Sequence, residues 1–120
     1  MRTRVTRSFT FDAAHVLPWH PGKCRNLHGH TYRLEVSVEG PVDTHGVVAD
    51  FADIDTLVTR EIIDHFDHTY LNDVIENPTA EVIAADIWKR LEQHGLGSAA
   101  LSLARIRLWE TPDLSVELTP

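Results

Sequence analysis

The sequence predicts an α+β fold, in which two helices cover one face of an antiparallel four-stranded sheet. Two segments with alternating apolar and polar residues open the chain, two segments with helical spacing occupy its middle, and two more alternating segments close it. The predicted order is therefore ββααββ, and consecutive strands form hairpins. We expect a single domain over residues 1–120.

Composition and charge argue against several classes of binding partner. The chain carries 11 Lys and Arg against 18 Asp and Glu, a net charge of −7, which argues against a nucleic-acid partner because such binding needs a basic surface. No apolar run is long enough to span a bilayer, and the N-terminus reads as a strand rather than a signal peptide, so we expect no membrane partner. The single cysteine excludes an intrachain disulfide and suits the cytoplasm.

The first strand is predicted over residues 3–15 and the second over 28–39. In the first, one face collects Val5, Phe9, Phe11, Ala13 and His15, whereas polar residues take the other. In the second, His28 and His30 share a face with the apolar residues that follow. The connecting residues 16–27 contain two prolines and Cys24, and a loop of this length is usually functional.

Two helices follow. Asp50 is a candidate N-cap, and apolar residues from Phe51 onward keep helical spacing until the helix ends near Asp64. Residues 65–77 are irregular. Pro78-Thr79 opens the second helix, which Gly95 and Gly97 end.

The last quarter predicts a second hairpin. Ile106 and Leu108 alternate with polar residues, Thr111-Pro112-Asp113 forms the turn, and residues 114–118 return. An open four-stranded sheet leaves two edges to be paired, so oligomerisation through these edges is expected.

Three histidines predict a metal site. His15, His28 and His30 lie on the same face at the adjoining ends of two paired strands, and neutral imidazole is the commonest metal ligand. With no obvious fourth protein ligand, the set fits a catalytic site, which keeps a position open. Zinc is favoured, although ligand type also allows other divalent metals. The alternative is that His15 is a buried strand residue without a ligand role.

Cys24 permits three interpretations: a fourth metal ligand, a reactive thiol beside the metal, or a small buried hydrophobe. Its place in a polar loop argues against the last. Asp67-His68 is a candidate dyad in which the carboxylate orients the imidazole, with His65 as a rival to His68.

Glu110 ends a core-facing row after Ile106 and Leu108. A buried carboxylate needs a partner, and two parallel N–H donors, such as the amino-pyrimidinone edge of a pterin or guanine, would suit it. The alternative is a salt bridge to an arginine on a neighbouring strand.

Taken together, these residues resemble the family of 6-pyruvoyl- and 6-carboxy-tetrahydropterin synthases, which have the tunnelling fold, or T-fold. The matching stretches span nearly the whole chain: Phe11-Asp-Ala-Ala-His15, Cys24-x3-His28-Gly-His30, Val48-Ala-Asp50-Phe51, Asp67-His68-Thr-Tyr-Leu71-Asn72, Asn77-Pro-Thr79-Ala-Glu81 and Trp109-Glu110-Thr111. Two details depart from the usual pattern, Ala49 inside the third stretch and Trp109 before the glutamate, and neither removes a functional side chain.

The resemblance implies roles for individual residues. The zinc ligands would be His15, His28 and His30, and the catalytic triad would be Cys24, Asp67 and His68, which favours His68 over His65. Glu110 would anchor the pterin, and Thr79 and Glu81 would lie near the substrate. Triphosphate-binding candidates are Lys23, Arg25, Arg33 and Arg107.

The resemblance also implies a substrate and an assembly. The substrate would be 7,8-dihydroneopterin triphosphate, and the protein would form a homohexamer of two stacked trimeric barrels with active sites between subunits. The three residues between Cys24 and His28 resemble the bacterial 6-carboxy-tetrahydropterin synthases of queuosine and deazapurine biosynthesis. Three alternatives stay open: a 6-pyruvoyl-tetrahydropterin synthase, a metal-dependent hydrolase of purines or pterins, and a non-catalytic metal-binding or scaffold protein.

Overall fold

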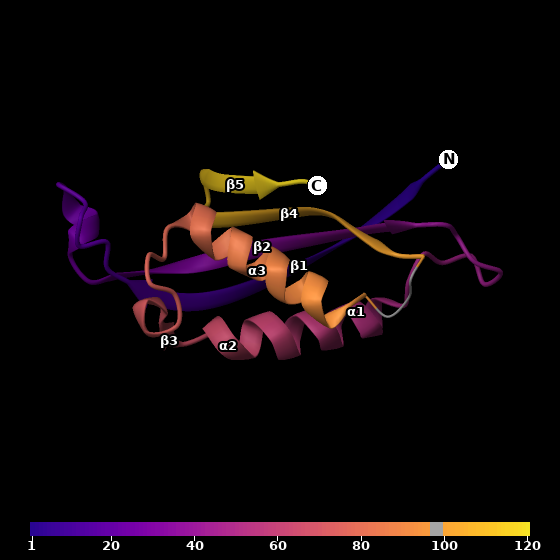
Figure 1. The fold of residues 1–120 in the computed structure, drawn as a ribbon, viewed down its shortest axis with the longest axis horizontal. Coiled ribbons are helices and arrows are strands. Elements are labelled where there is room, and N and C mark those ends of the chain that lie inside the picture. Colours follow the sequence, from indigo (N-terminus) through magenta and orange to yellow (C-terminus); the bar gives the residue numbers. More distant parts are fainter. Residues whose placement is uncertain (97–99) are drawn as a thin grey trace.

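The computed structural model, which describes residues 1–96 and 100–120, is a strongly elongated α+β structure built on one sheet (Figure 1). The sheet has five strands in the order β3-β1-β2-β4-β5. Both helical segments lie on the same face of this sheet (Figure 1). The ββααββ order is confirmed, with one additional short strand.

The central hairpin consists of β1 (Thr3–His15) and β2 (His28–Gly40). The two strands pair without interruption from Thr3 opposite Gly40 to His15 opposite His28. The alternation of the sequence thus becomes two faces, one buried under the helices and one exposed. His15 and His28 end as direct cross-strand neighbours at one tip of the molecule.

The first helical run begins where predicted. The Asp50 side chain accepts a hydrogen bond from the Ala52 amide, which caps the helix. The run comprises α1 (Phe51–Val58), the π-helical segment η2 (Thr59–Ile63) and α2 (Asp64–Phe66). It therefore continues two residues past the predicted end at Asp64, which places the buried Phe66 in the core.

The predicted four-stranded sheet is corrected by β3 (Thr69–Tyr70), which pairs parallel to β1 at Ala13 and Ala14. A strand of two residues has no measurable periodicity, so the sequence pattern could not reveal it. The short helix η3 (Leu71–Asp73) follows. The predicted irregular stretch 65–77 thus holds the end of one helix, a strand and a helical turn.

The second helix, α3 (Ala80–His94), is capped by Thr79, whose hydroxyl accepts from the Val82 amide. Gly95 ends it with a φ of 69°, a conformation that glycine adopts at little cost. The other predicted helix end, Gly97, lies outside the described residues. Across the part of the chain that the structure describes, no helix is long and apolar enough to cross a membrane.

The closing hairpin consists of β4 (Ser102–Thr111) and β5 (Leu114–Leu118). Its register shifts between Trp109 and Thr111, so Glu110 is the extra residue of a β-bulge with no partner on β5. Bulges bend a strand and redirect a side chain. The apolar core lies between the sheet and the helices, and its largest fully buried members include Phe11, Tyr32, Phe66, Leu34, Ile62, Ile83, Ile87, Leu91, Ile106 and Leu108.

Candidate metal and pterin site

The structure brings His15, His28 and His30 together at the tip of the central hairpin. One ligand atom from each lies within 4.8 Å of the others, and the closest pair, the Nε2 atoms of His15 and His28, is 3.0 Å apart. His15 is completely buried, whereas His28 and His30 are partly exposed. The strand geometry, with residues two apart facing the same way, produces this convergence.

Hydrogen bonds to backbone carbonyls assign the ring tautomers of two of these histidines. His15 Nδ1 lies 2.8 Å from the Pro78 carbonyl oxygen, and His28 Nδ1 lies 2.7 Å from that of Asn26. A carbonyl only accepts, so each Nδ1 carries the proton and donates it. In the neutral rings both Nε2 atoms therefore present lone pairs to each other.

His30 adds a third donor atom. Its Nε2 is buried and has no hydrogen-bond partner among the described residues. Burial lowers the pKa of His30, and this effect outweighs the opposing attraction of Glu110, so the ring is held in its neutral, ligating form. The Tyr32 hydroxyl nearby is likewise buried without a described partner, and burial raises its pKa.

Glu110 lies beside two of the three histidines. Its Oε1 lies 3.6 Å from His15 Nε2 and 3.6 Å from His30 Nε2, and its side chain is largely buried. The alternative partner expected from sequence, an arginine on a neighbouring strand, forms no ion pair with Glu110 in the described structure. The Glu110 carboxylate therefore lies on the same side of the sheet as the histidines that it faces.

These donors fit a divalent cation. Zinc–nitrogen bonds of about 2.0–2.1 Å in a tetrahedral site place neighbouring ligand atoms roughly 3.3 Å apart. The separation of 3.0 Å between the Nε2 atoms of His15 and His28 is close to that value, and all three ligand atoms lie within 4.8 Å of one another. Each backbone carbonyl that fixes a ring also orients its Nε2, as partners of metal-ligating histidines do. The cluster can therefore hold zinc or a similar ion.

Cys24 lies in the short helix η1 (Lys23–Arg25) within the loop that joins the two histidine-bearing strands. The Leu17 amide donates to the Cys24 carbonyl over 2.9 Å, which ties the middle of the loop close to the end of β1. The thiol is partly exposed and is not part of the histidine cluster.

Asn72 is a positioning residue whose role the sequence did not reveal. Its side-chain amide exchanges two hydrogen bonds with the backbone of Val16, each 2.9 Å long. Trp19 in the same loop donates to the Asn77 side chain. The segment before α3 thus holds the loop that carries Cys24, and only a motif match at Leu71-Asn72 signalled this.

Asp67 and His68 form a dyad on the other face of the sheet. His68 Nδ1 lies 3.0 Å from Asp67 Oδ2, and the Asp67 carboxylate also accepts from the Asp12 amide, which with His68 keeps the pKa of Asp67 below its usual range. His68 adopts a left-handed φ of 58°. The side-chain ligand atoms of Asp67, His68 and Asp12 lie within 4.8 Å of one another. Asp12 is on the exposed face of β1, and this face is opposite the one that carries the histidine cluster.

The remaining predicted residues are distributed as follows. Thr79 caps α3 immediately after Pro78, the residue bonded to His15, and Glu81 is exposed in the first turn of that helix. His65, the rival to His68, is exposed on α2. Among the triphosphate candidates, Lys23 and Arg25 are exposed beside Cys24. Arg33 and Arg107 instead pack against the Trp109 ring on the helix-free face.

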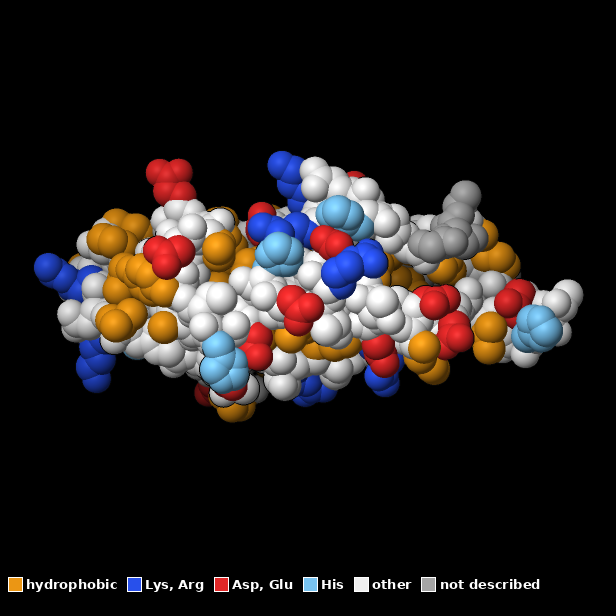
Figure 2. Space-filling model, turned by 90° about the horizontal axis from the view of Figure 1, so that it is seen from below, with side chains coloured by type: hydrophobic (Ala, Val, Ile, Leu, Met, Phe, Trp, Pro, Cys, Tyr) orange, Lys and Arg blue, Asp and Glu red, His pale blue; other side chains and the backbone are white. Residues whose placement is uncertain are grey.

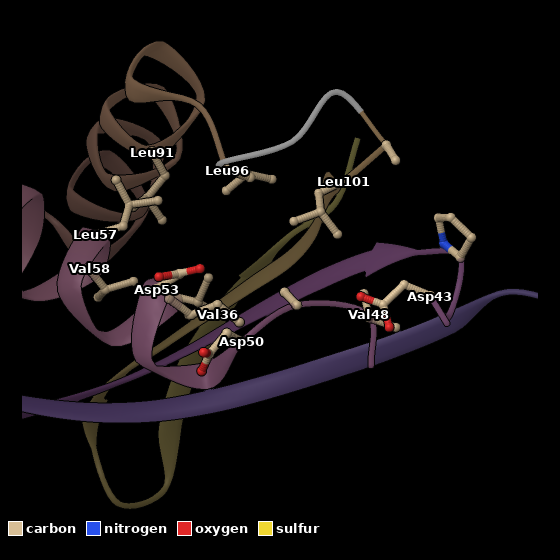
Figure 3. Close-up of a pocket in the computed structure, with 14 residues that line it drawn as sticks. Val36, Asp43, Val48, Asp50, Asp53, Leu57, Val58, Leu91, Leu96 and Leu101 are labelled. Atoms are coloured by element: carbon tan, nitrogen blue, oxygen red, sulfur yellow. The ribbon is translucent and has the colours of Figure 1, made fainter. Parts of the chain in front are cut away.

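A separate cavity of about 320 Å³ lies toward the end of the central hairpin opposite to the histidines. It is bounded by α1, α3 and the residues leading into β4, with Leu57, Leu91 and Leu101 among its apolar walls and Asp53 at one side (Figure 3). None of the predicted site residues lines it. On the face shown in Figure 2, acidic and basic side chains intermingle and neither sign forms a continuous patch.

Comparison with known proteins agrees with the motif pattern. Residues 4–120 match the family model described as 6-pyruvoyl tetrahydropterin synthase. The chain belongs to the 6-pyruvoyl tetrahydropterin synthase family. The 6-carboxy-5,6,7,8-tetrahydropterin synthase of Haemophilus influenzae is 36% identical over 135 residues, covering 91% of this chain and 93% of that protein. The dihydroneopterin monophosphate aldolase of Pyrococcus furiosus is 37% identical over 118 residues, covering 98% of each.

Solved structures of the family confirm the fold. The 6-pyruvoyl tetrahydropterin synthase of Caenorhabditis elegans superimposes with a TM-score of 0.87 at 25% identity, over 100% of this chain and 96% of that one. The predicted T-fold is therefore correct for the subunit, and its sheet is open at both edges rather than closed.

Proposed function

We propose that the protein is a zinc-dependent 6-carboxy-5,6,7,8-tetrahydropterin synthase. It would convert 7,8-dihydroneopterin triphosphate and water to 6-carboxy-tetrahydropterin with release of acetaldehyde and triphosphate, as a lyase. The observation that carries the proposal is the convergence of three imidazole donors and the Glu110 carboxylate at one strand tip. The name of the Haemophilus influenzae relative supports the carboxy branch.

The histidines would hold the zinc, which when bound supplies Lewis acidity toward the hydroxyls of the substrate side chain. The Glu110 carboxylate would accept two parallel N–H donors of the pterin ring and fix its orientation. Orientation of this kind makes the chemistry effectively intramolecular. Thr79 and Glu81, at the start of α3 beside the Pro78–His15 contact, would border the substrate.

Cys24 and the dyad would move protons. Cys24 would act as a thiolate and abstract a proton from the substrate side chain. His68, oriented by the Asp67 carboxylate at 3.0 Å, would shuttle protons at the other end of the reacting group. Within one chain the dyad and the histidine cluster occupy opposite faces of the sheet.

This separation supports a site assembled from more than one subunit. A dyad from a neighbouring chain would reach the histidine cluster if subunits packed around a common axis. The sheet provides edges for such packing, because β3 covers β1 only at Ala13 and Ala14 and β5 has no outer neighbour among the described residues. We propose that the subunits close into a barrel and stack as a homohexamer, a dimer of trimers.

The proposed setting is cytoplasmic, where the single thiol stays reduced. The product would feed queuosine or another deazapurine. The small-molecule partner is the pterin triphosphate, and we propose neither a nucleic-acid nor a membrane partner.

Product analysis tests the proposal. The zinc-loaded protein is incubated in separate arms with dihydroneopterin triphosphate and dihydroneopterin monophosphate, and the products are identified by chromatography and mass. Acetaldehyde and 6-carboxy-tetrahydropterin from the triphosphate support the proposal. A pyruvoyl product without acetaldehyde would assign the protein to the pyruvoyl branch. Turnover of the monophosphate alone would instead align it with the Pyrococcus furiosus aldolase.

A further inference from the structure

The Tyr32 hydroxyl is a buried polar group that the metal site does not explain. Two buried side-chain polar atoms have no hydrogen-bond partner among the described residues, His30 Nε2 and the Tyr32 hydroxyl oxygen. A metal ion held by the histidines would account for the first, because a neutral imidazole nitrogen offers it a lone pair. The tyrosine is not a member of that cluster. A buried hydroxyl without a partner costs free energy, so its retention calls for a reason.

Packing fixes the position of the Tyr32 hydroxyl. The side chain is fully buried, and its ring stacks on Phe11 with centroids 5.0 Å apart and planes 12° from parallel. The imidazoles of His30 and His15 lie edge-on to the same ring, with centroid distances of 5.6 and 6.4 Å. A side chain held in this way cannot turn its hydroxyl toward water, so a partner has to come to it.

Glu110 is the acceptor that the strand register brings beside Tyr32. Leu34 on β2 lies opposite Leu108 on β4, and two residues further toward the strand tip the same face carries Tyr32 and Glu110. The Glu110 carboxylate and the Tyr32 ring also lie against the same two imidazoles. The two side chains are therefore close neighbours on adjacent strands, in the arrangement that lets cross-strand pairs interact.

The two groups complement each other chemically. Burial, and then the negative charge of Glu110, raises the pKa of the Tyr32 hydroxyl, so the hydroxyl keeps its proton and can donate it. An ionised carboxylate only accepts, and its two oxygens offer about four lone-pair positions. The parallel N–H donors of a pterin edge would use one position on each oxygen. The carboxylate then still has a lone pair for a third donor.

We propose that Tyr32 is a positioning residue for the pterin anchor, and that its hydroxyl donates a hydrogen bond to the Glu110 carboxylate when this carboxylate holds the amino-pyrimidinone edge of a pterin. In the structure Glu110 Oε1 instead lies 3.6 Å from two histidine nitrogens. Pterin binding would turn the carboxylate toward the ring edge, and the fixed hydroxyl would then hold its plane. The inference rests on the pterin role that the proposed function gives to Glu110.

The proposal gives Tyr32→Phe two effects of opposite sign. Removal of the unpaired hydroxyl should make the protein more stable when no pterin is present. The same change should weaken pterin binding about tenfold, because a hydrogen bond to a charged group is lost from the complex. A tyrosine with a merely structural role would not lower the affinity for a ligand while its replacement raises stability.

Pterin affinity tests the proposal. Zinc-loaded protein is titrated with 2-amino-4-oxopteridine, a pterin without the side chain, and binding is followed by the fluorescence of the ring. Tyr32→Phe should bind about tenfold more weakly than wild type at unchanged zinc content. Tyr70→Phe, which alters the exposed second tyrosine, is the matched control and should bind as wild type. Equal affinity of Tyr32→Phe and wild type would overturn the proposal.

A double-mutant cycle shows whether Tyr32 acts through Glu110. Glu110→Gln keeps an acceptor oxygen without the charge, and a neutral hydrogen bond is about half as strong as a charge-assisted one. The loss of affinity caused by Tyr32→Phe should therefore shrink from about tenfold to about threefold in the Glu110→Gln background. An equal loss in both backgrounds would show that the hydroxyl contacts the pterin directly, which would overturn the proposal.

The presence of only two tyrosines in the chain allows a direct spectroscopic test. In protein labelled with carbon-13 at the tyrosine Cζ atoms, each NMR signal responds to hydrogen bonding of its own hydroxyl. The Tyr32 signal, assigned by its absence from Tyr32→Phe, should move when pterin saturates the site, whereas the Tyr70 signal should stay in place. A Tyr32 signal that does not move would overturn the proposal, whatever the affinities.

These readouts need no turnover, so they separate the inference from the proposed activity. A Tyr32 signal that moves, together with weaker pterin binding by Tyr32→Phe, would uphold the positioning role even if dihydroneopterin triphosphate gave no acetaldehyde. Conversely, acetaldehyde formation by a protein whose Tyr32 signal does not respond to pterin would uphold the activity and reject the positioning role.

Discussion

At the scale of single residues, the site depends on which lone pairs are already in use. Backbone carbonyls occupy the Nδ1 atoms of His15 and His28, and this leaves their Nε2 atoms directed at a common point. Strand parity predicts that the three imidazoles share a face, but it says nothing of tautomers. The contacts with Pro78 and Asn26 supply that information. Asn26 is a local neighbour of His28, whereas Pro78 lies far from His15 in the sequence, and spacing along the chain cannot bring those two together.

Replacement of Cys24 by alanine should lower kcat roughly 10²–10⁴-fold, the usual contribution of a positioned acid or base. Zinc content should stay at the wild-type level, because Cys24 is outside the histidine cluster. Steady-state kinetics and metal analysis on the same preparations check both statements. Full activity in this variant would favour a metal-dependent hydrolase that does not need a thiol.

Replacement of Tyr32 by phenylalanine should stabilise the zinc-free protein. The hydroxyl is buried and has no hydrogen-bond partner among the described residues, so its removal relieves a desolvation cost of about 1–3 kcal/mol. Chemical denaturation in the presence of a chelator measures the effect. The matched control is Tyr70→Phe on the exposed second tyrosine, with a change expected within about 0.5 kcal/mol. A Tyr32 variant clearly less stable than wild type would show that the hydroxyl is paired.

At the scale of secondary-structure elements, the alternation of apolar and polar residues and the helix N-cap residues predicted most of the fold. The first two strands and both helix starts lie where Val5–His15, Asp50 and Thr79 indicated. The features of the fold that were not predicted from the sequence leave no mark on the local pattern of residues. The bulge at Glu110 appears only when two strands are compared, and the Arg7–Asp55 pair, with contacts of 2.7 and 2.8 Å, joins β1 to α1 across 48 positions.

The start of α3 offers a test of the cap as distinct from substrate contact. Thr79→Ala should lower the free energy of unfolding by about 0.5–2 kcal/mol, because the Val82 amide loses its acceptor. Thr79→Ser keeps an oxygen in place and should restore nearly all of that stability. Denaturant titration of both variants measures their free energies of unfolding. If Thr79→Ser lost as much stability as Thr79→Ala, the threonine methyl group rather than the cap would provide the stability.

At the scale of the whole molecule, one chain holds the two halves of the proposed site apart. The histidine cluster lies on the helix-bearing face of the sheet, at the tip of the hairpin, whereas Asp67 and His68 gather beside Asp12 on the helix-free face. No sequence pattern predicts this division, since it follows from β3 joining the outer edge of β1. Motif matching identifies the functional residues, but it does not show which subunit contributes each of them to a given site.

Subunit complementation tests the shared site. Cys24→Ala and His68→Ala proteins should each be inactive, and mixed oligomers formed after dissociation and reassembly should regain activity. Regain is expected because some sites then combine an intact Cys24 from one chain with an intact His68 from its neighbour. Each variant reassembled with itself is the control, and light scattering reports the oligomer. Mixed oligomers without activity would show that each chain supplies its own dyad.

The most direct measurement is the amount of acetaldehyde formed per dihydroneopterin triphosphate consumed by the zinc-loaded protein. The proposed carboxy-tetrahydropterin synthase activity predicts a ratio of one, a matching amount of free triphosphate and no product after zinc is removed. Triphosphate release without acetaldehyde, or turnover that persists without metal, would contradict it.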